Sequence, residues 1–450
     1  MDGKDRISFG TDGIRGRANT PPMTAEAALR VGMAAGLHFR RNHSDKHRVV
    51  IGKDTRRSGY MLENALTAGL TATGMNVLLL GPVPTPAVGL LTRSMRADLG
   101  IMISASHNPY FDNGIKLFGP DGYKLSEMTE KKIESICNGN VASIDPEHIG
   151  RAKRIDDGLG RYVEFAKTTF PKTLRLNGLR VVVDCANGAA YRAAPEVLWE
   201  LGGEVLPVAV DPDGHNINFG CGTTDPHQAV AKVLETRADV GICLDGDADR
   251  LVVIDQTGSV VDGDQLLALL AERWLVKKRL KKNTLVTTIM SNYGMEQYLN
   301  GVGIKVERTA VGDRFVTEAM RRGGFKLGGE PSGHIVMSDY TTTGDGLIAA
   351  LQFLATMVES EVSAHEMTRI FDPLPQTLIN VPFRKGKRPL RDRQVRAAMR
   401  EGESRLKGNG RLVVRESGTE PVVRIMVESN DESKMRLAAN ELAAAIADAA

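Results

Sequence analysis

Apolar and polar residues follow two different spacings along this chain, and the two spacings alternate for most of its length. Short apolar runs predict buried strands, and longer stretches with an apolar residue every three or four positions predict amphipathic helices. The first such pair is a helix over Met23–Asn42, with Thr24 as a candidate N-cap, followed by a strand over Arg48–Gly52. Repeated strand–helix alternation is typical of mostly parallel sheets covered by helices.

The same pattern extends through three larger units and one smaller unit. Further helices are predicted over 58–74, 127–137, 159–170, 191–201, 228–237, 264–280, 293–300, 315–322 and 344–359, and strands over 75–80, 99–103, 179–184, 204–210, 240–244, 250–255, 284–289, 304–309 and 325–329. After the sequence DPLP the pattern changes, with strands predicted over 376–383, 411–415 and 422–428 and helices over 389–406 and 431–448.

Composition narrows the class of protein. The 450 residues are 42% hydrophobic, which is ample for several cores, and 58 basic residues nearly balance 55 acidic ones. A net charge of +3 argues against a general nucleic-acid or membrane-surface binder but leaves room for a local anion site. Four well-separated cysteines, and a start without a basic-then-apolar leader, predict a protein of the reducing cytoplasm.

The most informative stretch is IMISASHNPYFDNGIKLF at 101–118. An apolar strand runs into Ser-Ala-Ser-His-Asn-Pro (the serine loop, 104–109), which places Ser106 beside His107. A nucleophile beside an imidazole at the carboxyl end of a strand is where an open α/β sheet places its chemistry. Asn-Pro, and Asp-Asn-Gly after it, predict turns, with Lys116 on a new strand. Taken alone, a surface loop with a chance Ser-His pair explains the stretch equally well.

A second polar loop, Asp-Gly-Asp-Ala-Asp-Arg at 245–250 (the aspartate loop), directly follows an apolar strand. Carboxylates at alternate positions can converge on one hard divalent cation, and three of them leave room for a phosphate oxygen, which suits Mg²⁺. An EF-hand is excluded because Arg250 stands where glycine is needed, and Gln256 where glutamate is needed. A solvated acidic turn is the alternative.

Two later loops combine glycines with groups that bind sugars and phosphates. Gly-Gly-Glu-Pro-Ser-Gly-His at 328–334 (the Glu330 loop) carries a carboxylate, a hydroxyl and an imidazole, which can hydrogen-bond neighbouring sugar hydroxyls. Arg-Glu-Ser-Gly-Thr-Glu-Pro at 415–421 (the Arg415 loop), followed by Arg424, has the composition of a phosphate cradle. A plain turn and a plain hairpin loop are the respective alternatives.

Two loops near the N-terminus are also candidate anion sites. Gly-Thr-Asp-Gly-Ile-Arg-Gly at 10–16 places Arg15 between glycines, where the backbone can approach an anion closely. Residues 52–59 (GKDTRRSG) are basic and open a helix, whose N-terminus favours negative charge. A solvated turn accounts equally well for each loop.

Taken together, the serine, aspartate, Glu330 and Arg415 loops resemble the four signature loops of the α-D-phosphohexomutases. They stand in that family's order, one per unit, so the resemblance covers essentially the whole chain. It implies an α/β fold of three αβα domains, with mixed, mostly parallel sheets, and a smaller C-terminal α+β domain similar to the TATA-binding protein, around a central cleft. The implied domains are a phosphoserine domain (1–152), a metal-binding domain (153–257), a sugar-recognition domain (258–372) and a phosphate-binding domain (373–450).

Within that family, three further stretches resemble the branch that acts on glucosamine phosphates. They are GTDGIRG at 10–16, AVGDR at 310–314 and TTTGDG at 341–346. One position departs from the pattern, because Pro331 stands where glutamine is often seen. That change bears on the choice of substrate and leaves the reaction class untouched.

The resemblance also implies roles for the matching residues. Ser106 would carry a phosphoryl group as phosphoserine, and it would hold Mg²⁺ together with Asp245, Asp247 and Asp249. The implied catalytic residues are Ser106, His107, Lys116, Arg15 and His334; the substrate-binding residues are Glu330, Ser332, Arg250 and Arg314; and the phosphate-binding residues are Arg415, Ser417, Gly418, Thr419 and Arg424.

The implied reaction is that of an isomerase of the intramolecular phosphotransferase kind. It interconverts glucosamine 6-phosphate and glucosamine 1-phosphate through glucosamine 1,6-bisphosphate, which also serves as activator, and it supplies UDP-N-acetylglucosamine for cell-wall precursors. The implied partner is a sugar phosphate, without nucleic acid or membrane, and a homodimer is left open. A glucose or mannose phosphomutase of the same superfamily is the near alternative. A phosphatase with a serine nucleophile and a non-catalytic sugar-phosphate-binding regulator are more distant ones.

Overall fold

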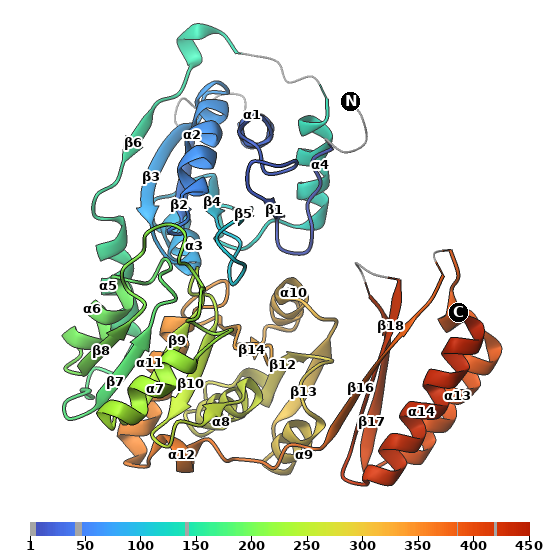
Figure 1. Ribbon diagram of the computed structural model, residues 1–450. Coiled ribbons are helices and arrows are strands. Elements are labelled where there is room, and N and C mark those ends of the chain that lie inside the picture. Colours follow the sequence, from blue (N-terminus) through green and yellow to red (C-terminus); the bar gives the residue numbers. More distant parts are fainter. Residues whose placement is uncertain (1–5, 41–46, 140–143, 385, 418–420) are drawn as a thin grey trace. The chain divides into compact units, whose positions relative to one another are not determined.

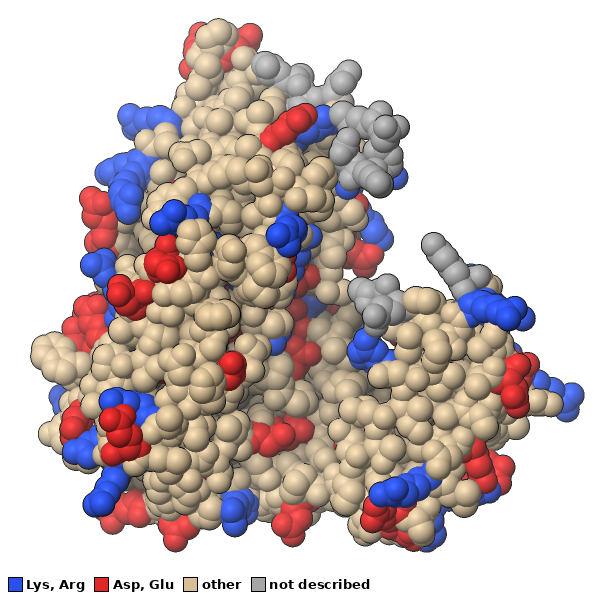
Figure 2. Space-filling model, viewed as in Figure 1, with Lys and Arg blue, Asp and Glu red and all other residues tan. Residues whose placement is uncertain are grey.

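The computed structural model describes residues 6–40, 47–139, 144–384, 386–417 and 421–450 and divides the chain into two compact units (Figure 1). The larger unit comprises residues 1–288 and 307–369, and the smaller unit comprises 289–306 and 370–450. Basic and acidic side chains are interspersed over the face seen in Figure 2, in keeping with the small net charge. No helix within the described ranges is long and apolar enough to cross a membrane.

The first sheet of the larger unit has the strand order β1-β5-β4-β2-β3-β6. Strands β2 (Arg48–Lys53), β3 (Asn76–Pro82), β4 (Leu99–Ile103) and β6 (Ala152–Arg154) are parallel, whereas β5 (Asp112–Phe118) is antiparallel to β4, and β1 (Ile14–Arg17) is antiparallel to β5. The helices of this region are α1 (Ala25–Phe39), α2 (Ser58–Thr71), α3 (Thr85–Ser94) and α4 (Glu127–Cys137). Apolar residues of α1, α2, β2, β4 and β5 form its core.

Two more sheets complete the larger unit. In the second, β7 (Arg180–Asp184), β8 (Glu204–Val208) and β9 (Val240–Leu244) are parallel. β10 (Leu251–Asp255) is antiparallel to β9, and β11 (Val260–Val261) is antiparallel to β10. In the third, β12 (Thr284–Thr288) runs parallel to β14 (Leu327–Gly329), which pairs antiparallel with β15 (Ile335–Met337). Their helices are α5 (Gly158–Thr169), α6 (Ala193–Glu200), α7 (His227–Thr236), α8 (Gly263–Val276), α10 (Asp313–Gly323), α11 (Gly346–Ser360) and α12 (Ala364–Met367).

The smaller unit contains an antiparallel sheet in the order β16-β18-β17. The strands are β16 (Gln376–Pro382), β17 (Gly410–Glu416) and β18 (Val422–Ser429), and α13 (Arg393–Leu406) and α14 (Glu432–Ala449) contact them. Alternate residues of β18, including Val423 and Ile425, point into a core shared with Val395 and Leu442 of the two helices. The unit also contains α9 (Tyr293–Gly301), and β13 (Lys305–Thr309) includes the boundary between the two units.

Most predicted elements are present, although some bounds differ and short elements such as β1, β6, β11, β15 and α12 were not predicted. Thr24 caps α1 as predicted, because its Oγ1 accepts a hydrogen bond from the backbone N–H of Ala27. The prediction did not include α3, which begins within a Pro-rich segment. Proline is tolerated in the first turn of a helix, because the backbone N–H that it lacks would have no partner within the helix. The Asp-Asn-Gly sequence at 112–114 lies in strand β5 and not in a turn, because pairing with β1 outweighs its local turn preference. The helix predicted over 389–406 begins only at residue 393, after a short 3-10 turn.

The aspartate loop is held by several other segments of the larger unit. The aspartate loop connects antiparallel strands β9 and β10. Its backbone carbonyls accept hydrogen bonds from the N–H of Thr85 at the start of α3 (2.9 Å) and of Gly346 at the start of α11 (3.0 Å). Leu251, next along the chain, donates to the carbonyl of Gly333 in the Glu330 loop (3.0 Å). Secondary-structure ends from distant parts of the sequence therefore fix the position of this loop.

Candidate active site

The serine loop leaves the carboxyl end of β4 and turns sharply at Ser106. Ser106 has a φ of 52°, which lies in the left-handed region that non-glycine residues seldom adopt. Its side chain is buried, and its backbone N–H donates to Oγ of Ser104 at 2.9 Å. A residue held in such a conformation at a strand end indicates that the surrounding structure determines it closely.

Two side chains, those of Arg56 and Asn218, donate hydrogen bonds to the same two backbone carbonyls of the serine loop. The guanidinium of Arg56 donates to the carbonyl oxygens of Ser106 (3.1 Å) and Asn108, and the amide of Asn218 donates to both of them at 2.9 Å. Arg56 is fully buried and ion-paired with Asp54. This arginine belongs to the basic loop predicted as an anion site or a solvated turn. It is buried, and its contacts are with Asp54 and the carbonyls of the serine loop.

The aspartate loop brings its three carboxylates together. Asp245, Asp247 and Asp249 are buried, and one oxygen from each lies within 4.8 Å of the others. The hydroxyl of Ser106 donates to Asp245 at 2.5 Å, so the nucleophile candidate is joined directly to this cluster. The backbone N–H of Arg250 donates to the other oxygen of Asp245 at 3.1 Å.

This carboxylate cluster fits a divalent cation. One oxygen of Asp247 and one of Asp249 are buried without a hydrogen-bond partner among the described residues. Burial, together with the neighbouring carboxylates of Asp249 and Asp247, raises the pKa of Asp245 to about 8. Three mutually repelling buried carboxylates, two of whose oxygens accept no hydrogen bond from the described residues, are the kind of donor set that Mg²⁺ prefers, and a cation there would offset the repulsion.

Lys116 lies next to the cluster on strand β5. Its Nζ lies 2.8 Å from Asp247, 3.3 Å from Asp12 and 3.5 Å from Asp249, and the side chain is buried. Burial alone would lower the pKa of Lys116, but the carboxylates of Asp12 and Asp247 outweigh it, and the pKa stands above its ordinary value. Lys116 is therefore a fixed positive charge beside the nucleophile candidate.

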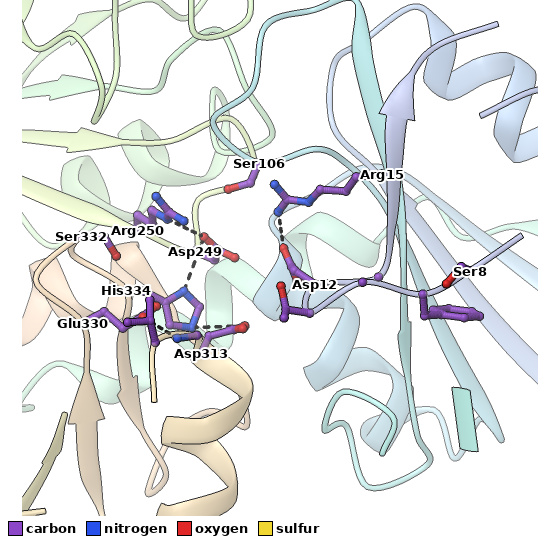
Figure 3. A pocket seen from close by; sticks show the side chains of 16 residues that line it. Ser8, Asp12, Arg15, Ser106, Asp249, Arg250, Asp313, Glu330, Ser332 and His334 are labelled. Carbon is purple, nitrogen blue, oxygen red and sulfur yellow. Dashed lines mark hydrogen bonds and ion pairs between the residues drawn. The ribbon is translucent and has the colours of Figure 1, made fainter. Parts of the chain in front are cut away.

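His334 occupies a tight space between two carboxylates, as Figure 3 shows. Its Nδ1 lies 3.6 Å from Asp249, and its Nε2 lies 3.9 Å from Asp313. Burial would lower the pKa of His334, but the carboxylates of Asp249 and Asp313 outweigh it and raise that pKa. A Cβ on Gly344 would lie within 2.4–2.7 Å of the imidazole ring, so only glycine leaves room for this histidine.

His107 is placed differently from His334. Its Nδ1 lies 3.5 Å from Oγ of Ser106. Burial, together with the positive charges of Arg250 and Arg15, lowers the pKa of His107 to about 4. The imidazole is therefore neutral near pH 7 and able to accept a proton. The pKa values of the two histidines are therefore shifted in opposite directions within one site.

A cavity of about 620 Å³ opens over these groups. Seven predicted residues line it: Arg15, Ser106, Asp249, Arg250, Glu330, Ser332 and His334 (Figure 3). Its size suits a small polar ligand, and its lining offers both signs of charge. The structure therefore brings the serine, aspartate and Glu330 loops to one cavity.

Other site residues lie outside that cavity lining or were not predicted. Arg314 donates to Glu130 at 2.7 Å and lines a neighbouring cavity of about 370 Å³. Asp12 and Asp313 line the main cavity, although neither was singled out from the sequence. Both stand inside the quoted stretches GTDGIRG and AVGDR, so the signal was present in the chain.

The Arg415 loop belongs to the smaller unit. Arg415 on β17 and Arg424 on β18 are directly opposite in the strand register, which places their side chains on the same face of the sheet. The backbone N–H of Ser417 donates to the carbonyl of Val422 at 2.8 Å and begins to close the hairpin. Gly418 and Thr419, predicted as phosphate ligands, lie outside the described residues.

Four family models match the chain in succession. They describe phosphoglucomutase/phosphomannomutase alpha/beta/alpha domain I at residues 6–142, domain II at 160–258 and domain III at 262–374, and the C-terminal domain at 378–445. Their order is that of the four predicted units, and the three αβα domains with a smaller C-terminal domain are confirmed.

Known proteins agree with these matches. A phosphoglucosamine mutase of Paracoccus denitrificans is 64% identical over 99% of this chain and 100% of its own length. Two solved structures share the fold: a phosphoglucomutase/phosphomannomutase family protein of Burkholderia thailandensis (TM-score 0.82, 24% identity, 98% and 97% of the two chains) and an N-acetylphosphoglucosamine mutase of Aspergillus fumigatus with GlcNAc-6P and magnesium (0.67, 19%, 98% and 96%). The chain belongs to the phosphoglucomutase/phosphomannomutase family of α-D-phosphohexomutases, and its relatives at 62–64% identity are phosphoglucosamine mutases.

Proposed function

We propose that this chain interconverts glucosamine 6-phosphate and glucosamine 1-phosphate by carrying a phosphoryl group on Ser106. One observation carries the proposal. The hydroxyl of Ser106 lies 2.5 Å from one carboxylate of a buried three-aspartate cluster, beside a cavity of about 620 Å³. The names of relatives at 62–64% identity over nearly the whole chain favour glucosamine phosphate over glucose or mannose phosphates as substrate.

The reaction runs in two balanced transfers. Phospho-Ser106 gives its phosphoryl group to O1 of glucosamine 6-phosphate, and the released Ser106 oxygen takes up a proton. The O1 proton leaves to a base, for which His107 and His334 are the candidates. The resulting 1,6-bisphosphate turns over in the site. The Ser106 hydroxyl then gives up its proton and takes the phosphoryl group from O6. The O6 oxygen gains a proton, and glucosamine 1-phosphate is left. The phosphoserine is restored at the end of the cycle, so the enzyme gains and loses no phosphoryl group overall.

The described residues divide this work by their chemistry. Lys116 and Arg15 place fixed positive charge near the transferring group, where negative charge spreads over the phosphoryl oxygens. Glu330 and Ser332 line the cavity and can hold sugar hydroxyls in both orientations of the bisphosphate. Arg415 and Arg424 lie on one sheet face, where they can hold the phosphate that does not react.

Mg²⁺ is the cation that the carboxylate cluster would hold. Asp245, Asp247 and Asp249 would bind it together with the phosphorylated Ser106 side chain. When bound, the ion withdraws charge from the phosphoryl oxygens and offsets the repulsion of the three carboxylates. The magnesium in the Aspergillus fumigatus protein supports this assignment.

The test is a comparison of substrates on the purified chain. With Mg²⁺ and a trace of glucosamine 1,6-bisphosphate, turnover of glucosamine 6-phosphate is expected to exceed that of glucose and mannose 6-phosphates. Intact-mass analysis should show one added phosphoryl group, which peptide mapping should locate on Ser106. Equal or better turnover of glucose or mannose phosphate would assign the chain to the broader mutases, and continuous release of inorganic phosphate would make it a phosphatase. A cytoplasmic location is part of this proposal, and a homodimer is left open.

A further inference from the structure

A lysine that the sequence patterns did not single out connects the two sides of the cavity. The ammonium group of Lys124 donates to Asp12 and also to Asp313. Figure 3 shows Asp12 beside Arg15 on one side of the cavity and Asp313 beside His334 on the other. Lys124 itself is not among the residues that line the cavity, and its side chain is only 12% exposed.

The backbone fixes Lys124 in this position. Lys124 forms an isolated antiparallel bridge with Phe118, and the N–H of Leu125 donates to the carbonyl of Leu117 at 3.0 Å. The turn between Phe118 and Lys124 is also joined to the segment between β15 and α11, because the hydroxyl of Thr342 donates to the carbonyl of Gly122 at 2.5 Å. Lys124 therefore reaches its two carboxylates from a turn that is held at both ends.

The two contacts of Lys124 close a ring of alternating charges. Lys116 lies 3.3 Å from Asp12, and His334 lies 3.9 Å from Asp313. Asp249 joins the other ends, at 3.5 Å from Lys116 and 3.6 Å from His334. The ring runs Lys116, Asp12, Lys124, Asp313, His334, Asp249 and back to Lys116.

The proposed mechanism gives no role to Asp12 or Asp313. Within the described residues, these two carboxylates are the ion-pair partners of Lys124. Asp12 and Asp313 are both partly buried carboxylates, with 21% and 15% of their side chains exposed, and they repel each other unless a cation lies between them. Asp12 also faces Arg15 and Lys116, so a shift of Asp12 would move charges that act on the transferring group. If Lys124 were only a structural ion pair, its removal would leave the charges of Arg15 and Lys116 in place.

We propose that Lys124 is a positioning residue for phosphoryl transfer. By holding Asp12 and Asp313, it sets the positions of Lys116 and His334 relative to Ser106 without touching substrate. The inference rests on the proposed function, since it concerns the geometry of that reaction. Charged hydrogen bonds behind reacting groups commonly change activity by about 10- to 100-fold when they are removed.

The test replaces the charge of Lys124 while keeping the length of its side chain. In Lys124→Met, kcat for glucosamine 6-phosphate is expected to fall by about 10- to 100-fold, with KM changed by less than about threefold. Lys124→Arg, which keeps a cation at this position, should recover part of that loss. Lys131→Met is the matched control, because Lys131 is ion-paired with Glu127 but is 67% exposed on α4. Its kcat should equal that of the unaltered chain.

A double variant separates positioning from general stability. If Lys124 acts through Asp313, then Lys124→Met combined with Asp313→Asn should lose no more kcat than the worse single variant. Melting curves give the folded fraction at the assay temperature, and kcat is expressed per folded molecule. Unchanged kcat per folded molecule in Lys124→Met, or losses that multiply in the double variant, would overturn the inference. An unaltered chain without mutase turnover would overturn the proposed function and this inference together, whereas mutase turnover that survives Lys124→Met would overturn the inference alone.

Discussion

The aspartate loop and the Arg415 hairpin are built in opposite ways. The aspartate loop is buried, and the ends of α3 and α11, the serine loop and the Glu330 loop all contact it. Arg415 and Arg424, by contrast, project from one face of a three-stranded sheet in a separate unit and are partly exposed. Chemistry at a phosphoryl group needs fixed positions, whereas holding a distant phosphate needs mainly charge and reach. We therefore expect changes in the first region to lower kcat and changes in the second to raise KM.

The largest effect should come from removing the nucleophile. Ser106→Ala keeps the buried backbone turn but leaves no oxygen to carry the phosphoryl group, so mutase turnover should fall by on the order of 10⁴-fold or more. Steady-state assays measure that loss, and intact-mass analysis should show no added phosphoryl group. Ser104→Ala is the control, because Ser104 lies in the same loop but holds the backbone N–H of Ser106. It should keep its phosphoserine, and an unphosphorylated Ser104→Ala protein would contradict the assignment to Ser106.

Removal of the divalent cation should have the next largest effect. Because the carboxylate cluster repels itself without a cation, chelation is expected to lower turnover by about 10³-fold, and added Mg²⁺ should restore it. Asp247→Asn should not recover with Mg²⁺ to the same extent. Turnover that persists after exhaustive chelation and metal analysis would mean that the cluster is only a structural acidic turn.

The chemistry-bearing loops could be predicted from the sequence because each is a short local pattern. Carboxylates at alternate positions after an apolar strand remain neighbours however the rest of the chain folds, and the Asp245–Asp249 spacing therefore predicted the cluster that the structure contains. The strand–helix alternation also indicated the layered architecture, because periodicity is set by local geometry. The turn expected at 112–114 was wrong because that segment pairs with β1, nearly a hundred residues away in sequence.

The supports behind the site could not be predicted in this way. Asn218 contacts Ser106 across 112 positions, and Lys124 contacts Asp313 across 189. Asn, Lys and Arg residues of this kind are common on solvated surfaces, so nothing local marks them as buried partners. Only the assembled fold shows that they hold the reacting groups.

Changes in the Arg415 hairpin should weaken substrate binding. Arg415→Met should raise KM for glucosamine 6-phosphate by about 10- to 100-fold, since a charged hydrogen bond to phosphate contributes about 1.5–3 kcal/mol. It should leave kcat within about threefold at saturating substrate. Arg436→Met is the control, because Arg436 lies exposed on α14 of the same unit and pairs with Glu432. A fall in kcat without a change in KM would erase the distinction between the two regions.

A smaller loss should follow from loosening the serine loop. Asn218→Ala removes two hydrogen bonds of 2.9 Å to the carbonyls of Ser106 and Asn108, while Arg56 still holds both. We expect kcat to fall by about tenfold with little change in KM. Phe219→Ala is the neighbouring control, because that side chain is 80% exposed. An effect of Phe219→Ala as large as that of Asn218→Ala would show that the whole segment matters and not the amide contact.

The last effect concerns stability and not activity. Both tryptophans, Trp199 and Trp274, lie in the larger unit, so tryptophan fluorescence reports on that unit alone. Without metal, burial and the neighbouring carboxylates raise the pKa of Asp245 to about 8, so the folded state holds a proton that the unfolded state releases near pH 4. The free energy of unfolding should therefore fall as the pH rises from about 5 to 8. Mg²⁺ at a hundred times its Kd should add about 2.7 kcal/mol at pH 8 and flatten that slope. In urea titrations followed by tryptophan fluorescence, Asp245→Asn should flatten the slope without Mg²⁺ and reduce the stabilisation by Mg²⁺. A slope that Asp245→Asn leaves unchanged would come from other groups with raised pKa values, such as Asp345 and Asp184, whose pKa values burial raises to about 7 and about 6.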